Sequence, residues 1–139
     1  MTRPVAHHFG VTVADLDRAV EFYRDTLGLG PCERFSVSGE AFADVVGVDG
    51  ATGRFAHFDA DGARIELVEY DPEGAATTGD AINQPGVKHL GLTVEDLDAF
   101  YADLDPTVPT TSPPRTTETG TRICFVQDPE GNLIEILEA

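Results

Sequence analysis

HFGVTVADLD at residues 8–17 returns almost unchanged as HLGLTVEDLD at residues 89–98. A second stretch, GARIELVE at residues 62–69, returns as GNLIEILE at residues 131–138. The first pair is offset by 81 residues and the second by 69, so the second copy lacks twelve residues from its middle. Because a chain of 139 residues has the length of one domain, we expect a single domain, 1–139, built from two copies of one module.

Each module is expected to open with a strand and a helix. In the first copy, Phe9 and Val11 share one face of an alternating strand, and Asp15 is placed to cap a helix that ends at Leu27-Gly28. Asp96 stands in the matching place of the second copy. The start of each module therefore reads as β followed by α.

The rest of each module reads as strands and turns. Residues 30–70 carry strand and turn signals without a further helix, and four prolines in residues 105–114 favour a loop or an edge. Residues 71–85 are rich in Gly, Ala, Thr, Asp and Pro and are expected to form a linker. The pattern predicts an α+β fold of two βαβββ modules, at 5–70 and 86–139.

The charge of the chain excludes some partners. There are 25 acidic and nine basic residues, which gives a net charge of −16, and Lys88 is the only lysine. Such a chain repels nucleic acid and anionic membranes, so neither is expected as a partner. The acids are scattered, which indicates a solvated acidic shell of the halophilic kind. With no apolar stretch long enough for a membrane span or a signal peptide, we expect a cytoplasmic protein.

Two pairs of ligand-type residues recur in matched places of the two copies. They are His8 with Glu66 and His89 with Glu135. Strand alternation turns the histidines away from the apolar face and sets each glutamate between two apolar neighbours, where a carboxylate is costly unless it is paired or binds a cation. We therefore expect the four residues to bind one divalent metal. The alternative is four unrelated polar residues on a solvated sheet face.

Other candidate residues are given structural roles. His7 and His57 have no counterpart in the other copy and are expected to be structural or exposed. Glu69 and Glu138 do repeat, but they lie on the helix side at strand ends, and solvated carboxylates are expected there. The only cysteines, Cys32 and Cys124, lack CxxC spacing and are expected to be small buried hydrophobic residues.

These motifs resemble the vicinal oxygen chelate superfamily, which includes glyoxalase I, methylmalonyl-CoA epimerase, extradiol dioxygenases and bleomycin-type resistance proteins. The resemblance covers nearly the whole chain and is carried by residues 8–13, 15–29, 65–69 and 128–136. It implies that the two modules form a curved, eight-stranded, cup-like sheet with helices outside and the metal at its floor. A homodimer is expected, and pairing of the modules within one chain or across the dimer stays open.

The resemblance also implies a chemistry. His8, Glu66, His89 and Glu135 match the family's four ligand positions one for one, a set similar to that of glyoxalase I, whereas the epimerase usually has Gln where Glu66 stands. It implies one divalent ion (Ni, Zn, Co, Mn or Fe) with two adjacent positions for a small substrate that carries vicinal oxygens. The implied enzyme is a metal-dependent lyase or isomerase of glyoxalase I or methylmalonyl-CoA epimerase type. In it, Glu135 or Glu66 abstracts a proton next to a carbonyl to give an enediolate or enolate.

Two alternatives to this enzyme remain. One is a resistance-type protein that binds small molecules without catalysis. The other is an extradiol-type dioxygenase, although such enzymes typically bind iron through two His and one carboxylate in longer chains. No compact basic cluster is present for a glutathione adduct or a CoA phosphate. The candidates from separate segments are Arg34, Arg54, Arg115 and Lys88.

Overall fold

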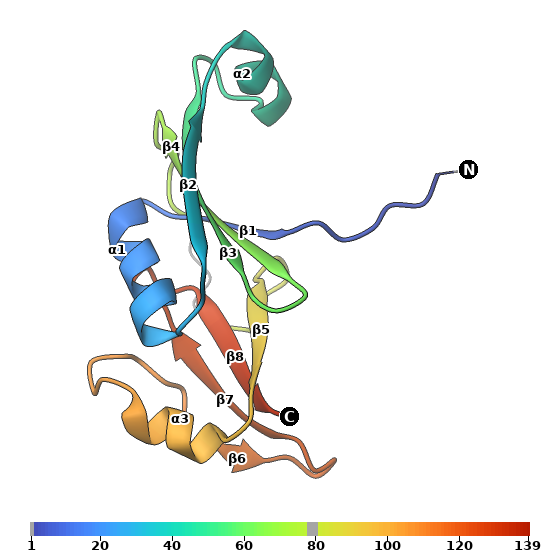
Figure 1. Cartoon of the computed structure of the whole chain (residues 1–139), viewed down its shortest axis with the longest axis vertical. Coiled ribbons are helices and arrows are strands. Elements are labelled where there is room, and N and C mark those ends of the chain that lie inside the picture. Colours follow the sequence, from blue (N-terminus) through green and yellow to red (C-terminus); the bar gives the residue numbers. More distant parts are fainter. Residues whose placement is uncertain (1, 78–80) are drawn as a thin grey trace. The chain divides into compact units, whose positions relative to one another are not determined.

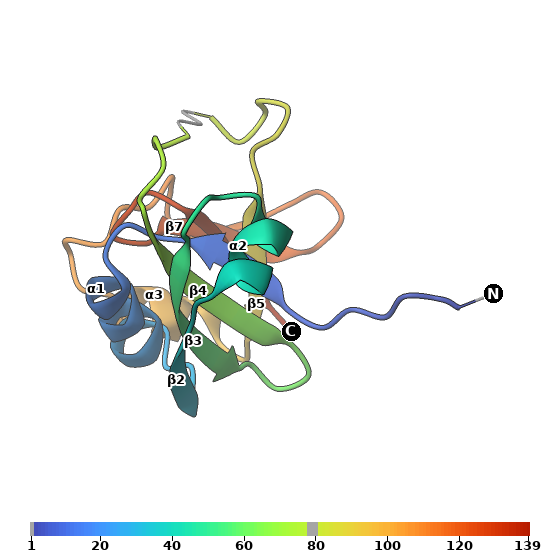
Figure 2. The same cartoon turned by 90° about the horizontal axis from the view of Figure 1, so that it is seen from above.

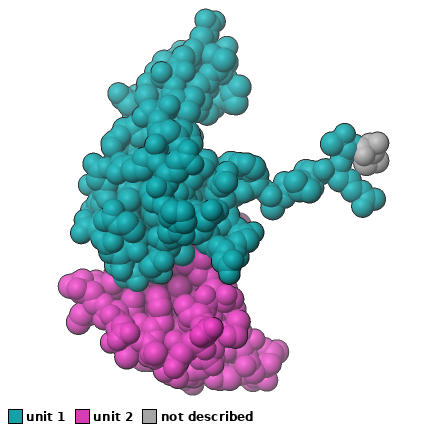
Figure 3. All heavy atoms as spheres, in the orientation of Figure 1, with its two compact units in different colours: residues 1–76 teal, residues 77–139 magenta. Residues whose placement is uncertain are grey.

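A computed structural model describes residues 2–77 and 81–139 of the chain (Figure 1). The chain divides into two compact units, residues 1–76 and 77–139, which Figure 3 shows in different colours. Each unit holds one four-stranded sheet, and the two sheets have the same topology. The predicted α+β class with two strand-rich modules is confirmed.

The first unit builds its sheet in the order β1-β4-β3-β2. β1 runs parallel to β4, and the other neighbours are antiparallel. Helix α1 continues without a break into a π-helical turn, η1, and packs on β3 and β4. The elements are β1 (Phe9–Thr12), α1 (Leu16–Glu21), η1 (Phe22–Thr26), β2 (Cys32–Val37), α2 (Glu40–Val46), β3 (Thr52–Asp59) and β4 (Arg64–Asp71).

The second unit repeats this plan in the order β5-β8-β7-β6. β5 is parallel to β8, as β1 is to β4, and the remaining pairs are antiparallel. Its elements are β5 (His89–Val94), α3 (Leu97–Asp103), β6 (Arg115–Thr116), β7 (Arg122–Gln127) and β8 (Leu133–Glu138). The proline-rich segment before β6 is a loop that touches β7 through one bridge, Thr110 with Val126, as its composition predicted.

Helix α2 was not predicted. The expectation that residues 30–70 hold only strands and turns is wrong, because Glu40–Val46 is helical. The helix lies on the face of the sheet opposite to α1 (Figure 2), where the ring of Phe42 packs against Phe55 and Tyr70 at centroid distances of 6.0 and 6.3 Å. This aromatic contact holds a helix too short to be stable alone. In the described part of the second unit, no helix lies between β6 and β7, which are joined by residues 117–121.

Strand alternation decides which residues form the core. In the first unit, Ile65 and Leu67 are fully buried under α1, and Glu66 between them faces the other way. Ile134 and Ile136 are buried in the same way on either side of Glu135. The predicted parity of the glutamate-bearing strands is confirmed.

The helix caps also agree with the sequence. The side chain of Asp15 accepts a hydrogen bond from the backbone N–H of Arg18 at 3.1 Å, and Asp96 accepts one from Ala99 at 3.0 Å. These contacts satisfy amide groups that a helix leaves unpaired at its first turn. Both helices therefore begin where the caps predicted.

Glu69 is half-buried, so the expectation of a solvated carboxylate is wrong there, whereas Glu138 is exposed as expected. Glu69 Oε1 accepts a hydrogen bond from the backbone N–H of Leu16, and Glu138 Oε2 accepts one from that of Leu97, both at 3.0 Å. Both side chains point to the helix side of their sheet, which brings each carboxylate to the start of its helix. Each unit thus ties its last strand to its first helix by the same contact, which suits a negative charge beside the positive end of a helix.

The two cysteines are free thiols. Cys124 is buried and Cys32 is half-buried, and burial raises the pKa of both thiols above its ordinary value. Both are thus poor nucleophiles near neutral pH. Within the described residues, no helix is long and apolar enough to cross a membrane.

Candidate metal centre

The first unit brings His8 and Glu66 together. Gly10 of β1 pairs with Glu66 of β4, and His8 lies two residues before Gly10, so its side chain shares the face of Glu66. His8 Nε2 lies 3.5 Å from Glu66 Oε2. The glutamate side chain is only 14% exposed and that of the histidine 37%, which leaves the pair shielded on one side and open on the other.

The second unit repeats this geometry. Gly91 of β5 pairs with Glu135 of β8, and His89 lies two residues before Gly91. His89 Nε2 lies 3.6 Å from Glu135 Oε2, and the exposed fractions are again lower for the glutamate, 22%, than for the histidine, 39%. Two His–Glu pairs with nearly equal separations thus occupy equivalent positions in the two units.

A glycine beside each glutamate keeps space open. A Cβ atom on Gly10 would lie 3.7 Å from Glu66 Oε1, and one on Gly91 would lie 3.8 Å from Glu135 Oε2. Any longer side chain at either position would fill the space next to the carboxylate. The repeated HxG stretch therefore both places a histidine beside the glutamate and leaves room next to the carboxylate.

The pairs suit a divalent metal. Metal–nitrogen and metal–oxygen bonds near 2.1 Å place two ligands at right angles about 3 Å apart, so separations of 3.5 and 3.6 Å need only a small adjustment. Among the residues that the structure describes, no three His, Cys, Asp or Glu side chains gather closely enough to hold an ion. Each unit by itself supplies one His–Glu pair of this kind, and the first unit also has His57 next to Glu66.

His57 is the residue that the sequence analysis undervalued. It lies directly across from Glu66 in the β3–β4 ladder, and its Nε2 is 2.7 Å from Glu66 Oε2. It is half-buried, with a side chain only 15% exposed. The turn at residues 60–63 could have revealed the contact of His57 with Glu66. Counting residues outward from this turn along both strands pairs position 57 with position 66.

His7 is exposed, as expected, but it contacts a candidate ligand. Its Nδ1 lies 2.8 Å from His8 Nδ1, and the two rings meet edge to face at 5.1 Å. One of the two nitrogens donates and the other accepts. His7 therefore helps to orient the His8 ring, a role the sequence did not indicate.

Aromatic side chains surround the first pair. Phe35 stacks on Phe55 with a centroid distance of 5.1 Å and meets the edge of the His57 ring at 4.9 Å. In the second unit, the Phe125 ring lies 5.5 Å from that of His89. Each glutamate thus shares its sheet face with aromatic rings as well as with polar residues, among them His57 and Arg64 on the face of Glu66.

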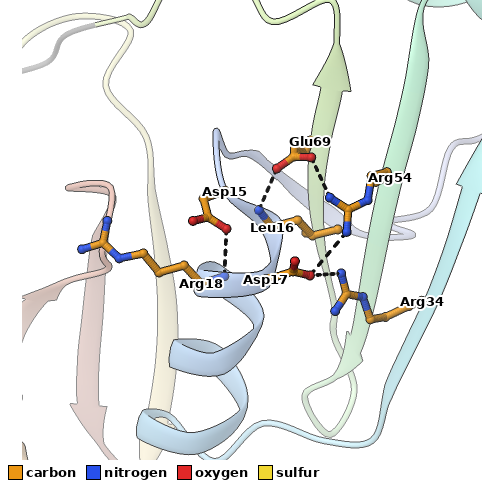
Figure 4. Close-up of polar contacts among 7 residues, drawn as sticks. All are labelled: Asp15, Leu16, Asp17, Arg18, Arg34, Arg54 and Glu69. Carbon is orange, nitrogen blue, oxygen red and sulfur yellow. Dashed lines mark hydrogen bonds and ion pairs between the residues drawn. The ribbon is translucent and has the colours of Figure 1, made fainter.

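Arg34 and Arg54 do not lie on that face. Strand register puts Arg54 beside Glu69, on the helix side of the sheet, and Arg34 lies on the same side. Figure 4 shows both guanidinium groups against Asp17, with nitrogen–oxygen distances of 2.6 Å for Arg34 and 3.3 Å for Arg54, and Arg54 also reaches Glu69 at 2.8 Å. Arg34 and then Arg54 hold the pKa of the Asp17 carboxyl below its usual range.

The other two basic candidates differ from each other. Lys88 donates to the carbonyl oxygen of Gly86 at 2.9 Å. Arg115 on β6 pairs with Ile123, which in turn pairs with Leu137, so register places Arg115 on the same sheet face as Glu135. Of the four basic residues considered above, Arg115 is the one that shares a face with a candidate ligand.

Comparison with known proteins identifies the family. The model of the glyoxalase/bleomycin resistance protein/dioxygenase superfamily matches residues 5–136. The chain belongs to this superfamily. No curated protein shows significant similarity to the chain.

Solved structures of the superfamily share the fold. A glyoxalase family protein from Bacillus cereus has a TM-score of 0.86 at 24% identity, over 99% of this chain and 95% of that one. The trypanothione-dependent glyoxalase I of Leishmania major has a TM-score of 0.64 at 24% identity, over 98% and 87% of the two chains. A glyoxalase family protein from Enterococcus faecalis gives 0.64 at 20% identity, over 96% and 97%. At these identities, the likeness is one of fold.

Proposed function

We propose that the protein is a metal-dependent lyase or isomerase of the glyoxalase I or methylmalonyl-CoA epimerase type. In this proposal, His8, Glu66, His89 and Glu135 bind one divalent ion. The observation that carries it is the repeated His–Glu pair, with separations of 3.5 and 3.6 Å on matching strands of the two units. Membership of a superfamily that includes such enzymes supports the same function.

The residues of the chain suit proton transfer next to a carbonyl. A bound divalent ion would supply a Lewis acid that polarises the carbonyl oxygen of the substrate. One glutamate then takes a proton from the neighbouring carbon and returns it. Apolar surroundings favour this step, because a carboxylate that moves among apolar side chains gains affinity for a proton. Phe35 and Phe55 on the face of Glu66, and Phe125 on that of Glu135, supply part of such surroundings.

The placement of the arginines bears on the substrate class. Arg34 and Arg54 are held by Asp17 and Glu69 on the far side of the first sheet from Glu66, so they do not bind a substrate anion beside that residue. Arg115 shares the face of Glu135 in the second unit. Strand alternation also puts Arg64 on the face of Glu66. We infer a small substrate with vicinal oxygens.

A second candidate function is binding without catalysis. Phe35 stacks on the buried Phe55 on the face of Glu66 and remains 37% exposed, so it offers an apolar surface there. A protein that sequesters apolar small molecules needs such a surface and no metal. Metal content therefore separates the two functions.

The decisive experiment measures metal binding and proton exchange on the same protein. The purified protein is loaded with Ni, Co, Zn or Mn and assayed for bound metal and for deuterium exchange into small 2-oxo and 2-hydroxy carbonyl compounds. We expect a fixed metal stoichiometry and exchange in at least one compound. A protein that takes up none of the four ions but binds apolar compounds would favour the sequestering function.

Single variants then test the ligands. His8→Ala and His89→Ala should each lose bound metal, because each removes a nitrogen ligand. His7→Ala is the matched control and should weaken binding by no more than about tenfold, the lower range for a group that only orients a ligand. Equal loss in His7→Ala and His8→Ala would show that the wrong histidine is assigned.

A further inference from the structure

The two glutamates face different residues on the neighbouring strand. Across from Glu66 on β3 lies His57, and across from Glu135 on β7 lies Phe125. The strands, the register and the His–Glu separations are otherwise equivalent. The duplicated half-sites therefore differ on the strand next to each glutamate, as they also differ at His7, which contacts His8.

The His57 ring is fixed in place. Its Nε2 lies 2.7 Å from Glu66 Oε2, a length typical of a charge-assisted hydrogen bond in which the ring N–H donates to the carboxylate. Phe35 meets the ring at 4.9 Å with an interplanar angle of 86°, and His8 stacks on it at 6.1 Å. Contacts of this kind restrict both the ring and the carboxylate that it holds.

Phe125 offers no such hydrogen bond to Glu135. A phenyl ring has neither a donor nor an acceptor group, and this ring packs against His89 at 5.5 Å with an interplanar angle of 65°. The carboxylate of Glu135 is also the more exposed of the two, at 22% against 14% for Glu66. The neighbouring strand β7 thus restrains the carboxylate of Glu135 less than β3 restrains that of Glu66.

We propose that His57 is a positioning residue that holds Glu66 in place as a metal ligand, a contact that Glu135 lacks. This role rests on the proposed function, because it concerns one of the four ligands given there. Outer groups that hydrogen-bond a ligand are worth about 10- to 100-fold in metal affinity. The histidine supplies that contact in one unit alone.

The test is the affinity for Zn²⁺ and Ni²⁺, measured by chelator competition. His57→Phe, which copies the second unit, should weaken affinity by about 10- to 100-fold. His57→Gln should recover part of the loss, because its amide can still donate. Phe58→Leu is the control for general loosening of β3, because Phe58 is buried on the opposite face, and it should change affinity by no more than about twofold.

A double-mutant cycle locates the contact. In a Glu66→Gln background, His57→Phe should lower metal affinity only slightly, because the charged acceptor is already gone. In a Glu135→Gln background, it should lower metal affinity as much as it does in the unaltered protein. Additivity with both glutamates would overturn the role. So would unchanged affinity in His57→Phe, or complete loss of metal in His57→Phe with retention in His8→Ala, which would make His57 a ligand itself. Failure of the unaltered protein to bind either ion would instead overturn the proposed function as a whole.

Discussion

The two units share a sheet topology but differ in what surrounds their glutamates. Both place a histidine 3.5 to 3.6 Å from a glutamate, beside a glycine that leaves space. The first unit adds His57 as a hydrogen-bond donor, while the second has Phe125 at that position. A duplicated scaffold thus keeps the two His–Glu pairs alike while one residue on the next strand makes their surroundings different.

The helix ends give a second contrast. In each unit, a glutamate at the end of the last strand accepts the first backbone N–H of the helix. In the first unit, Glu69 also forms an ion pair with Arg54, and both Arg54 and Arg34 form ion pairs with Asp17. Asp98 takes the place of Asp17 in the second unit, and among the described residues its ion-pair partner is Arg122. A larger network of ion pairs thus holds the first helix of the first unit than holds that of the second unit; Figure 4 shows the network of the first unit.

The largest expected effect sharpens the contrast between the glutamates. Glu135→Gln should keep bound metal and lower turnover by about two to four orders of magnitude, the usual scale for a lost general base. Glu66→Gln should lower turnover less at saturating metal, because His57 holds that residue as a ligand. Steady-state rates of the metal-loaded variants decide this. Full activity in Glu135→Gln with metal bound would move the base to Glu66 or to another acid such as Asp44.

A smaller effect is expected at the helix ends. Glu69→Ala should lower the free energy of unfolding by about 1 to 2 kcal/mol, because it removes a helix-terminal acceptor. Glu138→Ala should cost less, since Glu138 is exposed while the Glu69 side chain is only 25% exposed and also binds Arg54. Urea unfolding measures both. Equal losses would show that the larger network of the first unit adds no stability.

Salt should act on both units alike. Residues 1–76 carry 14 acidic and six basic residues and residues 77–139 carry 11 and three, so each range has a net charge of −8. Like-charge repulsion should lower the melting temperature in dilute buffer and be relieved in about 2 M KCl, where the Debye length is very short. Thermal denaturation in both buffers tests this. An unchanged melting temperature would remove the halophilic interpretation.

The smallest effect concerns acid. Arg34 and Arg54 lower the pKa of Asp17, and Arg122 lowers that of Asp98, from the ordinary value of 3.8. Because each pKa is lower in the folded state, the stabilisation is present above pH 3.8 and is lost as the pH falls through the folded value. Carboxyl titration by NMR should find both midpoints below 3.8. Both aspartates are fully exposed, so the effect on stability should be small.

The sequence by itself determined the duplicated plan and the parity of its strands. Alternation at residues 9–12 and around Glu66 and Glu135 predicted which side chains face the helix, and the caps at Asp15 and Asp96 predicted where the helices begin. These features depend on neighbours along the chain, so periodicity reveals them. The four candidate ligands came from the same local reasoning and remain a proposal.

Only the tertiary structure decided what stands across from those residues. His57 beside Glu66, the carboxylates of Glu69 and Glu138 at the helix starts, and the Phe42 contact that holds α2 all join segments separated along the chain. For the contacts at the helix starts and at α2, a residue's own neighbours in sequence carry no signal, because the packing of a helix on a sheet fixes them. The contact of His57 depends on cross-strand register, which the turn at residues 60–63 sets. The contact that distinguishes Glu66 from Glu135 is therefore set by the fold.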